Sequence, residues 1–438
     1  MPHLNPLSSH ETKTTRIATQ LRERTSTQPL SLRKTAVSHM VPKAFDKKYK
    51  DEKIDISDLS AILEIDPEKK FCVAEPGVTF VDLVKATLPL GLVPMTVPEF
   101  KTITIGGAVA GCSIESMSFQ YGGFHDSCFE YEVITADGRV LTCTPDNEHS
   151  LIFQMMHGTF GTLGIISKLK FRLVPAKPFV KVIYEKYSHV ESYELAIRRH
   201  FKTRDVDFMD GFVHSPTLYV LNLGVFVDQA PYQNRYDWMK IYYQTTATRD
   251  EDYLRTPDYF FRYDRGVTGV RFSSFFGRLF FGKFASSSHI LRLAEKIHWL
   301  LPRKRPTVTL DIFVSISKIK TFLKWYEHEF QHFPLWVVPY KRTRDYEWAN
   351  KSFYEAAGSD ELFVDLAIYG MKQRGDKNYY RIMEEKLMEI GGIKTLISHN
   401  FYSEEEFWKN WNKPNYDQVK AITDPKGMFR DLYQKTCR

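Results

Sequence analysis

The spacing of apolar and polar positions predicts short strands and helices, with glycine-rich turns concentrated in the first part of the chain. Residues 71–77 are predicted to form a strand that ends in a turn. Phe80, Leu83 and Val84 then fall on one face of a predicted helix at 79–88. Asp137-Gly138 lies between two apolar runs, which is typical of a β-hairpin. A glycine turn then leads into a long strand that ends near residue 175.

The pattern changes near residue 178, after which aromatic strands alternate with helices. We therefore predict a first domain at 1–178, a second at 179–390 and a C-terminal segment at 391–438 that returns towards the first. The predicted strands are 208–213, 218–227, 307–316, 335–340, 361–369 and 395–402, and the predicted helices are 11–23, 191–201, 289–300, 319–330 and 379–390.

Composition narrows the class of protein. A chain of 438 residues is long enough for at least two domains, and its net charge of +7 is too small to indicate nucleic-acid binding. The five cysteines form no CxxC pair, which indicates reduced thiols and no zinc site. The N-terminus has no apolar leader and no run spans a bilayer, so we expect a protein that is cytoplasmic or peripheral on the cytoplasmic membrane face.

Two glycine-rich windows are the main candidates for chemistry. The first contains Gly106, Gly107 and Gly111, and it either presents main-chain N–H groups to an anion or forms a turn in the core. The second contains Gly158, Gly161 and Gly164. Neither is GxGxxG or GxxxxGK[ST], which disfavours a Rossmann domain and a P-loop nucleotidase. HExxH and an EF-hand loop are also missing from the sequence.

Taken in chain order, several segments resemble a known family. The polar turn at 33–39, AEPGVTFVDLV, TIGG, ADGRV and GTLGI resemble FAD-linked oxidoreductases of the vanillyl-alcohol-oxidase (PCMH-type) fold. The resemblance extends to the delta-24-sterol reductase (diminuto/seladin) branch and its bacterial relatives, through Ile114-Glu115-Ser116, CTP, GTLG, VPAK, FPLW, VDLAIYG and EEFW. It covers about residues 15–435. The chain departs from that branch at Ile397 and His399, where relatives often carry Tyr and Asp.

The resemblance implies an α+β fold, in which a PCMH-type FAD-binding domain of two α+β subdomains precedes an α+β substrate (cap) domain with an antiparallel sheet. It implies non-covalent FAD, although His39 also suggests the histidine linkage that some members of the fold carry. The positions that it assigns to FAD are Arg33, Lys34, Thr35, Ser38, His39, Thr102, Ile105, Gly106, Gly107, Gly111, Cys112, Glu115, Ser116, Gly122, Gly161, Thr162, Ile165 and Ile166.

The activity implied is NADPH-dependent reduction of a C=C bond in a lipid, either a sterol side chain or a methylene-branched acyl chain. Such a reduction requires a proton donor beside the flavin. The candidates are Glu115, Asp365, Tyr369 and His399, each of which has a purely structural alternative as an ion pair or a core residue. Two other functions stay open: an FAD-dependent alcohol or sugar oxidase or dehydrogenase of the same fold, and a non-catalytic flavin- or lipid-binding protein.

The segment 275–284 is unusually apolar, aromatic and basic. It is either a contact with a membrane interface that passes the lipid inward, or a connector buried within the cap domain. The oligomeric state does not follow from any pattern in the sequence.

Overall fold

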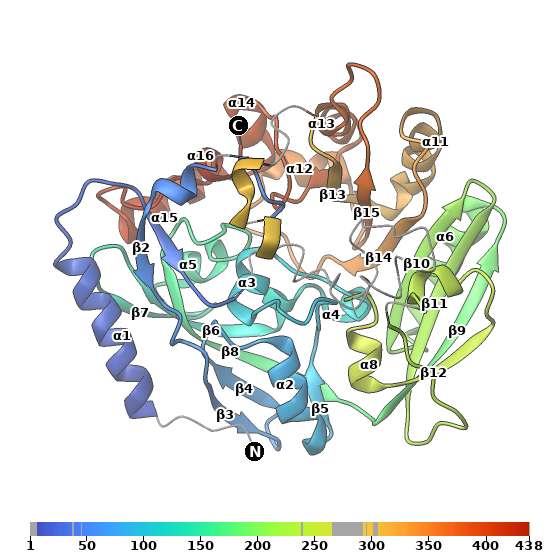
Figure 1. The fold of residues 1–438 in the computed structure, drawn as a ribbon, viewed down its shortest axis with the longest axis horizontal. Coiled ribbons are helices and arrows are strands. Elements are labelled where there is room, and N and C mark those ends of the chain that lie inside the picture. The colour runs from blue at the N-terminus through green and yellow to red at the C-terminus, as the bar shows by residue number, and fades with distance from the viewer. Residues whose placement is uncertain are drawn as a thin grey trace.

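Two antiparallel sheets organise the chain, and the chain passes from one to the other between Pro175 and Phe179 (Figure 1). The computed structural model describes residues 7–36, 39–44, 46–237, 240–264, 292–294, 296–300 and 305–437. The mixture of helices with antiparallel sheets confirms the predicted α+β class. The predicted domain boundary near 178 falls in the connection between the two sheets.

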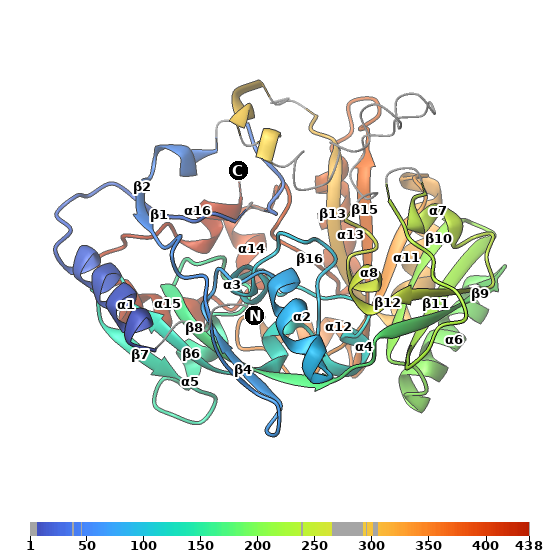
Figure 2. The same cartoon turned by 60° about the horizontal axis from the view of Figure 1, so that its bottom comes forward.

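The first sheet has six strands. Its order is β3-β4-β8-β6-β7, and β5 pairs with the far end of β8. A separate parallel pair, β1 with β2, precedes this sheet in the chain, and Figure 2 shows β1 next to α16. The strands are β1 (Leu30–Arg33), β2 (Glu52–Asp55), β3 (Ile62–Asp66), β4 (Phe71–Ala74), β5 (Leu92–Pro94), β6 (Cys128–Ile134), β7 (Val140–Cys143) and β8 (Ile165–Pro175).

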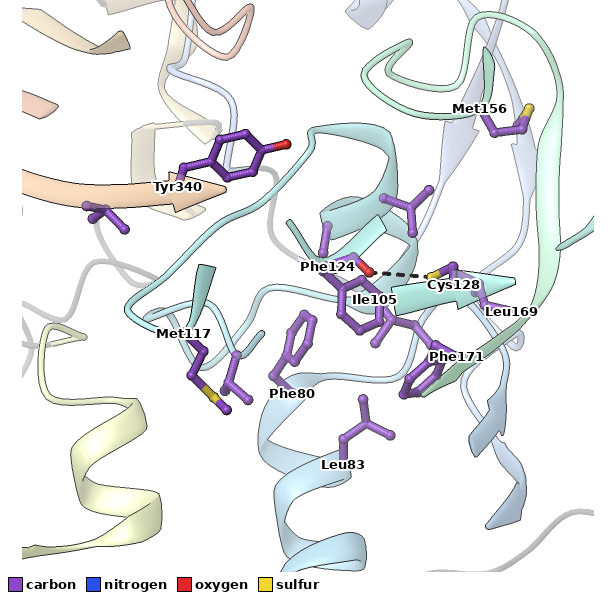
Figure 3. Packing of buried hydrophobic residues seen from close by; sticks show 14 of the residues in the cluster. Phe80, Leu83, Ile105, Met117, Phe124, Cys128, Met156, Leu169, Phe171 and Tyr340 are labelled. Atoms are coloured by element: carbon purple, nitrogen blue, oxygen red, sulfur yellow. Dashed lines mark hydrogen bonds between the residues drawn. The ribbon is translucent and has the colours of Figure 1, made fainter. Parts of the chain in front are cut away.

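Helix α2 (Phe80–Thr87) shows why this first domain packs as it does. Thr79 caps the helix by accepting a hydrogen bond from the Asp82 main-chain N–H, and the apolar face predicted from the spacing is buried. Phe80 meets Phe124 edge-on at 4.9 Å, and Phe124 meets Phe171 of β8 at 5.1 Å (Figure 3). These rings join the helix to the sheet and hold the segment after α3 in place.

The second sheet has eight strands in the order β12-β9-β11-β10-β14-β15-β13-β16. Helices α6, α11 and α13 cover one face, against apolar residues such as Leu310, Ile312 and Leu366. The opposite face, towards the first domain, carries the alternate residues of the same strands. The strands are β9 (Phe179–Tyr187), β10 (Phe208–Ser215), β11 (Leu218–Val227), β12 (Glu251–Arg255), β13 (Val308–Ser315), β14 (Leu335–Lys341), β15 (Leu362–Met371) and β16 (Ile393–Lys394).

The last part of the chain packs back on the first domain. The main-chain oxygen of Thr423 accepts a hydrogen bond from the Ala136 main-chain N–H at 2.7 Å, and the main-chain oxygen of Met428 accepts one from that of Leu30 at 2.8 Å. Figure 2 shows the C-terminal helices beside β1 and β6.

The helices of the described residues are α1 (Leu7–Arg22), α2, α3 (Ile105–Ala110), α4 (Ser118–Tyr121), α5 (Ser150–Met155), α6 (Val190–Thr203), α7 (Tyr242–Thr245), α8 (Thr256–Phe260), α11 (Ile319–Glu329), α12 (Lys351–Ala357), α13 (Tyr379–Ile390), α14 (Glu404–Asn410), α15 (Lys413–Thr423) and α16 (Leu432–Thr436).

The strand predicted at 395–402 is wrong. Only Ile393–Lys394 pairs with the sheet, and the chain then turns. The side-chain amide of Asn400 donates to the main-chain oxygens of Leu396, Ser398 and Thr436. Side-chain bonds of this kind compete with a β-ladder and favour a turn.

None of the described helices is both long and apolar enough to cross a membrane. The segment 275–284 and part of the helix predicted at 289–300 lie outside the described residues.

Candidate active site

A cavity of about 280 Å³, here called the central cavity, lies between the loop after α3 and the open face of the second sheet. On the loop side it is lined by residues 111–114 and by His39. On the sheet side the register sets the lining, because Asp311 pairs with Ala367 and Phe313 pairs with Asp365. Alternation along the two strands therefore turns Thr309, Asp311, Phe313, Asp365 and Tyr369 to one face, and all five line the cavity.

Three carboxyl groups share this cavity. Burial raises the pKa of Glu99 to about 8 and that of Asp311 to about 6. Burial raises the pKa of Asp365 well above its usual range, and the neighbouring Asp311 and Glu99 carboxylates add to the rise. Like charges in one apolar site cannot all ionise, so the cluster retains protons at neutral pH. The Tyr369 hydroxyl is a hydrogen-bond partner of Asp311 and belongs to the same group.

His39 closes another side of the central cavity. Its Nε2 lies 2.9 Å from the Thr102 hydroxyl oxygen, and its ring stacks on Phe100 with centroids 5.4 Å apart. Burial, together with the positive charge of Lys34, lowers the pKa of His39 to about 4. The imidazole is therefore neutral near pH 7.

A smaller cavity of about 90 Å³, here called the aromatic cavity, adjoins the central one. The two have Gly111, Cys112, Ile114, Phe313 and Thr395 in common. The rest of its wall is mostly aromatic: Phe160, Tyr340, Tyr346, Trp348, Phe353, Tyr354, Phe363 and Trp411.

A third cavity of about 340 Å³, here called the basic cavity, lies between β1, residues 43–51 and the C-terminal segment. Its cationic lining consists of Lys43, Lys47, Lys48, Arg430 and Lys435, against the two carboxylates Asp46 and Asp51. Gly161 also lines it with a φ of +69°, and an added Cβ would meet only Leu32, at 3.8 Å.

The residues present fit an extended dinucleotide such as FAD. The basic cavity offers lysines to phosphates, and the central cavity offers apolar and aromatic walls to a flat ring system. One segment runs along both, because His39, Val41 and Pro42 line the central cavity while Lys43 and Ala44 line the basic cavity.

The glycine window before the central cavity is packed into the core and is not an open array of amides, which was one of its two predicted alternatives. Residues 105–110 form the short helix α3, and the N–H groups of Ile105 and Gly106 donate to the main-chain oxygens of Val78 and Pro76. The N–H of Gly107 donates to the Thr104 hydroxyl. A Cβ on Gly106 would lie 2.5 Å from the Pro76 Cβ, so this glycine serves close packing. The window thus positions residues 111–114, which line the cavity.

The structure does not bring Glu115 to the central cavity. Its Oε1 lies 3.0 Å from the Arg262 guanidinium, which also lies 3.2 Å from Asp210, and its Oε2 accepts hydrogen bonds from Ser116. Burial raises the pKa of Glu115 to about 6, while Arg262 works against the rise. Glu115 therefore takes the structural role that was its alternative, with an ion pair to Arg262 and hydrogen bonds within its own loop. The Asp210 carboxylate also accepts from the Trp336 indole at 3.0 Å, and Trp336 lines the cavity.

His399 is likewise not among the residues that line the central cavity. It is buried, its ring packs against Tyr380, and its main-chain oxygen accepts a hydrogen bond from the Lys394 ammonium at 2.8 Å. The turn that replaces the predicted strand carries the side chain away from the face that Asp365 and Tyr369 share.

Of the positions assigned to FAD, four line these cavities: His39, Gly111, Cys112 and Gly161. Thr102 contacts His39. Ser38 lies outside the described residues. Arg33, Lys34 and Thr35 are exposed, and Ile165 and Ile166 are buried in β8. Thr162 donates to the Thr159 oxygen, and Gly122 adopts a φ of +79° in a turn against Asp126.

Sequence reasoning missed Glu99, Asp311 and the lysines of the basic cavity. Asp311 carries a visible signal, because it is the one charged residue in the alternating strand VTLDIFVS. Glu99 carries none, because it follows Pro98 in a segment without regular periodicity.

Comparisons with known proteins agree with this geometry. The FAD binding domain family matches residues 35–144. Delta(24)-sterol reductase of Homo sapiens is 25% identical over 415 residues, which is 90% of this chain and 79% of that protein. The enzyme of the same name from Pisum sativum is 25% identical over 444 residues, 89% of this chain and 77% of that protein.

Cytokinin dehydrogenase 5 of Arabidopsis thaliana is 28% identical over 151 residues, which is 34% of this chain and 28% of that protein. The shorter match agrees with a shared FAD-binding fold, whereas the sterol reductases match both domains. The chain is thus an FAD-linked oxidoreductase of the PCMH-type fold, similar to Delta(24)-sterol reductases along nearly its whole length.

Proposed function

We propose that the protein reduces a C=C bond in a lipid, with FAD as its cofactor, NADPH as the electron donor and Asp365 as the proton donor. One observation carries the proposal: three carboxyl groups, whose pKa burial raises, line a cavity whose other walls are mainly apolar and aromatic. The names of the relatives, which are sterol reductases, support the substrate class and the direction of the reaction.

The chemistry of an isolated alkene explains why such a cavity is suitable. Reduction adds a proton to one carbon and a hydride to the other, and bound FAD supplies the hydride. The chain must supply the proton from a group that is still protonated at neutral pH. If the proton arrives first, the other carbon develops positive charge. Trp336 and Phe313 line the same cavity, and an aromatic ring that presents its face to this charge would stabilise it by a cation–π attraction of about 0.5–2 kcal/mol.

Asp365 is the best placed of the three acids. It is buried, and its cross-strand partner is Phe313, so it lies among the aromatic walls. The charges of Asp311 and Glu99 raise its pKa further, and hydrogen bonds from the main chain oppose them only in part. Asp311 and Glu99 would then pass a proton back to Asp365 after each turnover.

A second function has one observation in its favour. Alcohol oxidation needs a base near the substrate hydroxyl, and His39 is a neutral imidazole that lines the central cavity. A histidine with a pKa near 4 is a weak base, whereas the protonated acids suit the reductive direction directly.

The test uses the full chain loaded with FAD. Under anaerobic conditions NADPH should reduce the flavin, and a sterol alkene should then reoxidise it. We expect Asp365→Asn to retain FAD but to slow reoxidation by about 10²–10⁴-fold, the usual contribution of general acid catalysis. Asp207→Asn is the matched control, since Asp207 is also an acid whose pKa burial raises, but it lies outside the central cavity.

Two results would contradict the proposal. Flavin that is bleached by alcohols but not by NADPH would favour the oxidase. Equal rates of reoxidation in Asp365→Asn and Asp207→Asn would remove Asp365 from the reaction.

A further inference from the structure

The aromatic cavity holds two buried hydrogen-bonding side chains without partners. His125 is 1% exposed, and neither of its ring nitrogens makes a hydrogen bond to a described residue. The indole N–H of Trp348 is also buried and has no partner in the described part of the chain. Leaving buried polar groups unpaired is costly, so two of them at one cavity indicate a ligand that completes them.

Neighbouring polar groups do not satisfy these two side chains. His125 Nε2 lies 3.4 Å from an Asp126 oxygen but makes no hydrogen bond to it. The Asp126 carboxylate already accepts from the hydroxyls of Thr343, at 2.7 Å, and Tyr346, at 2.9 Å, and from a main-chain N–H. The Tyr340 hydroxyl is bonded to that of Tyr346. The hydroxyls of both tyrosines are therefore already used within the protein.

The position of the two side chains separates them from the central cavity. Of the three cavities described above, His125 and Trp348 line the aromatic cavity and not the central one, whereas Thr395, whose hydroxyl has no partner among the described residues, lines both. A molecule that reaches His125 from the central cavity must therefore extend past Ile114 and Phe313, which the two cavities share.

The chemistry of the two side chains selects a neutral group that both donates and accepts. Burial lowers the pKa of His125, so its ring is neutral and offers one acceptor nitrogen, while Trp348 offers one donor. A hydroxyl matches both, whereas a carboxylate cannot donate to the histidine. Two cationic residues also line the cavity, and both are already engaged: Arg342 packs over the rings of Tyr354 and Phe363, and the Lys394 ammonium pairs with the buried Glu384 carboxylate.

We propose that the aromatic cavity is a specificity subsite, in which His125 and Trp348 bind the hydroxyl of an apolar ring system on the same lipid whose double bond lies in the central cavity. This inference rests on the proposed function, because it places the reacting end beside Asp365. It selects a rigid lipid alcohol over a fatty acyl chain, since the subsite combines ring walls with one neutral polar end.

The first experiment needs no variant. A sterol alkene with a ring hydroxyl and the deoxy analogue of the same alkene are titrated into the FAD-loaded full chain, and binding is followed by the change in flavin absorbance. We expect the hydroxyl compound to bind at least about tenfold more tightly, because the deoxy analogue leaves both buried groups unpaired.

Two variants then identify the residues. His125→Phe and Trp348→Phe keep a ring in the wall but remove the hydrogen-bonding nitrogen. Each should bring the two affinities within about threefold of each other, mainly by weakening the hydroxyl compound. Tyr354→Phe is the matched control, because Tyr354 also lines the cavity but its hydroxyl bonds the Tyr346 main-chain oxygen. It should keep the preference.

The outcomes separate this inference from the proposed function. If both alkenes reoxidise the reduced flavin but bind wild type equally, the subsite is wrong and the reductase stands. If His125→Phe loses FAD while it remains folded, the aromatic cavity belongs to the flavin and the inference is also wrong. If an unsaturated fatty acid binds more tightly than the sterol alcohol, the subsite recognises a carboxylate through Arg342 and the inference is wrong. If no alkene reoxidises the flavin, the proposed function itself fails.

Discussion

Arg262 joins the loop after α3 to the second sheet, and its removal gives the sharpest test of how the central cavity is held together. Its side chain is 0% exposed and lies 3.0 Å from Glu115 and 3.2 Å from Asp210. It also stacks over the rings of Tyr259 and Tyr263, at 4.0 and 4.4 Å. The change Arg262→Met keeps much of the apolar stem but leaves two buried carboxylates without their cation.

The magnitude follows from burial. Breaking a buried ion pair by removing one partner costs about 3–5 kcal/mol, because the remaining charge is not solvated. An exposed pair contributes only about 0–1 kcal/mol. Arg198 forms a partly exposed pair with Glu194 of α6, at 2.8 Å, and also lies 3.9 Å from Asp360, so Arg198→Met is the matched control. Glu115→Gln should cost less than Arg262→Met, because Arg262 retains Asp210.

Urea unfolding of the full chain, followed by tryptophan fluorescence and by circular dichroism, measures the difference. We expect Arg262→Met to lower the free energy of unfolding by about 3–5 kcal/mol and Arg198→Met by less than about 1 kcal/mol. A loss for Arg262→Met no larger than that of the control would refute the view that this cation holds the two domains together.

Three further predictions follow from single groups. Because the pKa of Glu99 is raised to about 8, alkene-dependent reoxidation should fall as pH rises through 8, and Glu99→Gln should move that limb of the profile. His10 lies 2.9 Å from Glu75, and its pKa is raised from 6.5 to about 9. The stability that protonated His10 contributes should be complete below pH 6.5 and should be lost as pH rises through 9. The urea midpoint of the wild type should therefore fall over this pH range, and that of His10→Gln should not show this fall. Gly106→Ala should lower the thermal midpoint, because the new Cβ would lie 2.5 Å from that of Pro76; an unchanged midpoint would contradict this.

Periodicity predicted many of the elements because the apolar faces of those elements are regular. The strand at 218–227 and the helix at 379–390 occur with the predicted bounds, since each buries one continuous face. The failures lie where side chains replace the regular main-chain pattern. Asn400 stabilises a turn in place of a strand, and Thr104 caps a short helix in the glycine window for which an open amide array and a core turn were the two alternatives.

The sequence predicts only the part of the candidate site that lies on a single strand, β15. Alternation along β15 places Asp365 and Tyr369 on one face, and the structure turns that face to the loop at residues 111–114. Asp311 joins them through the register of β13, and Glu99 arrives from the other domain, so both depend on tertiary contacts. Glu115 was assigned from its place in the loop, but the decisive partner, Arg262, is distant in the sequence.

The ion pairs of Arg262 and the carboxyl groups of the central cavity depend on the position of the same loop. The loop that carries Glu115 lines the central cavity at 111–114, and Ser116 accepts a hydrogen bond from the Met209 main-chain N–H of β10 at 2.7 Å. Asp210, the next residue, orients Trp336 through its indole N–H. A shift of this loop relative to the second sheet must therefore break an ion pair or move an aromatic wall of the cavity. Because a proton donor works only within hydrogen-bond reach, the carboxyl groups are useful only while these contacts fix the loop opposite them.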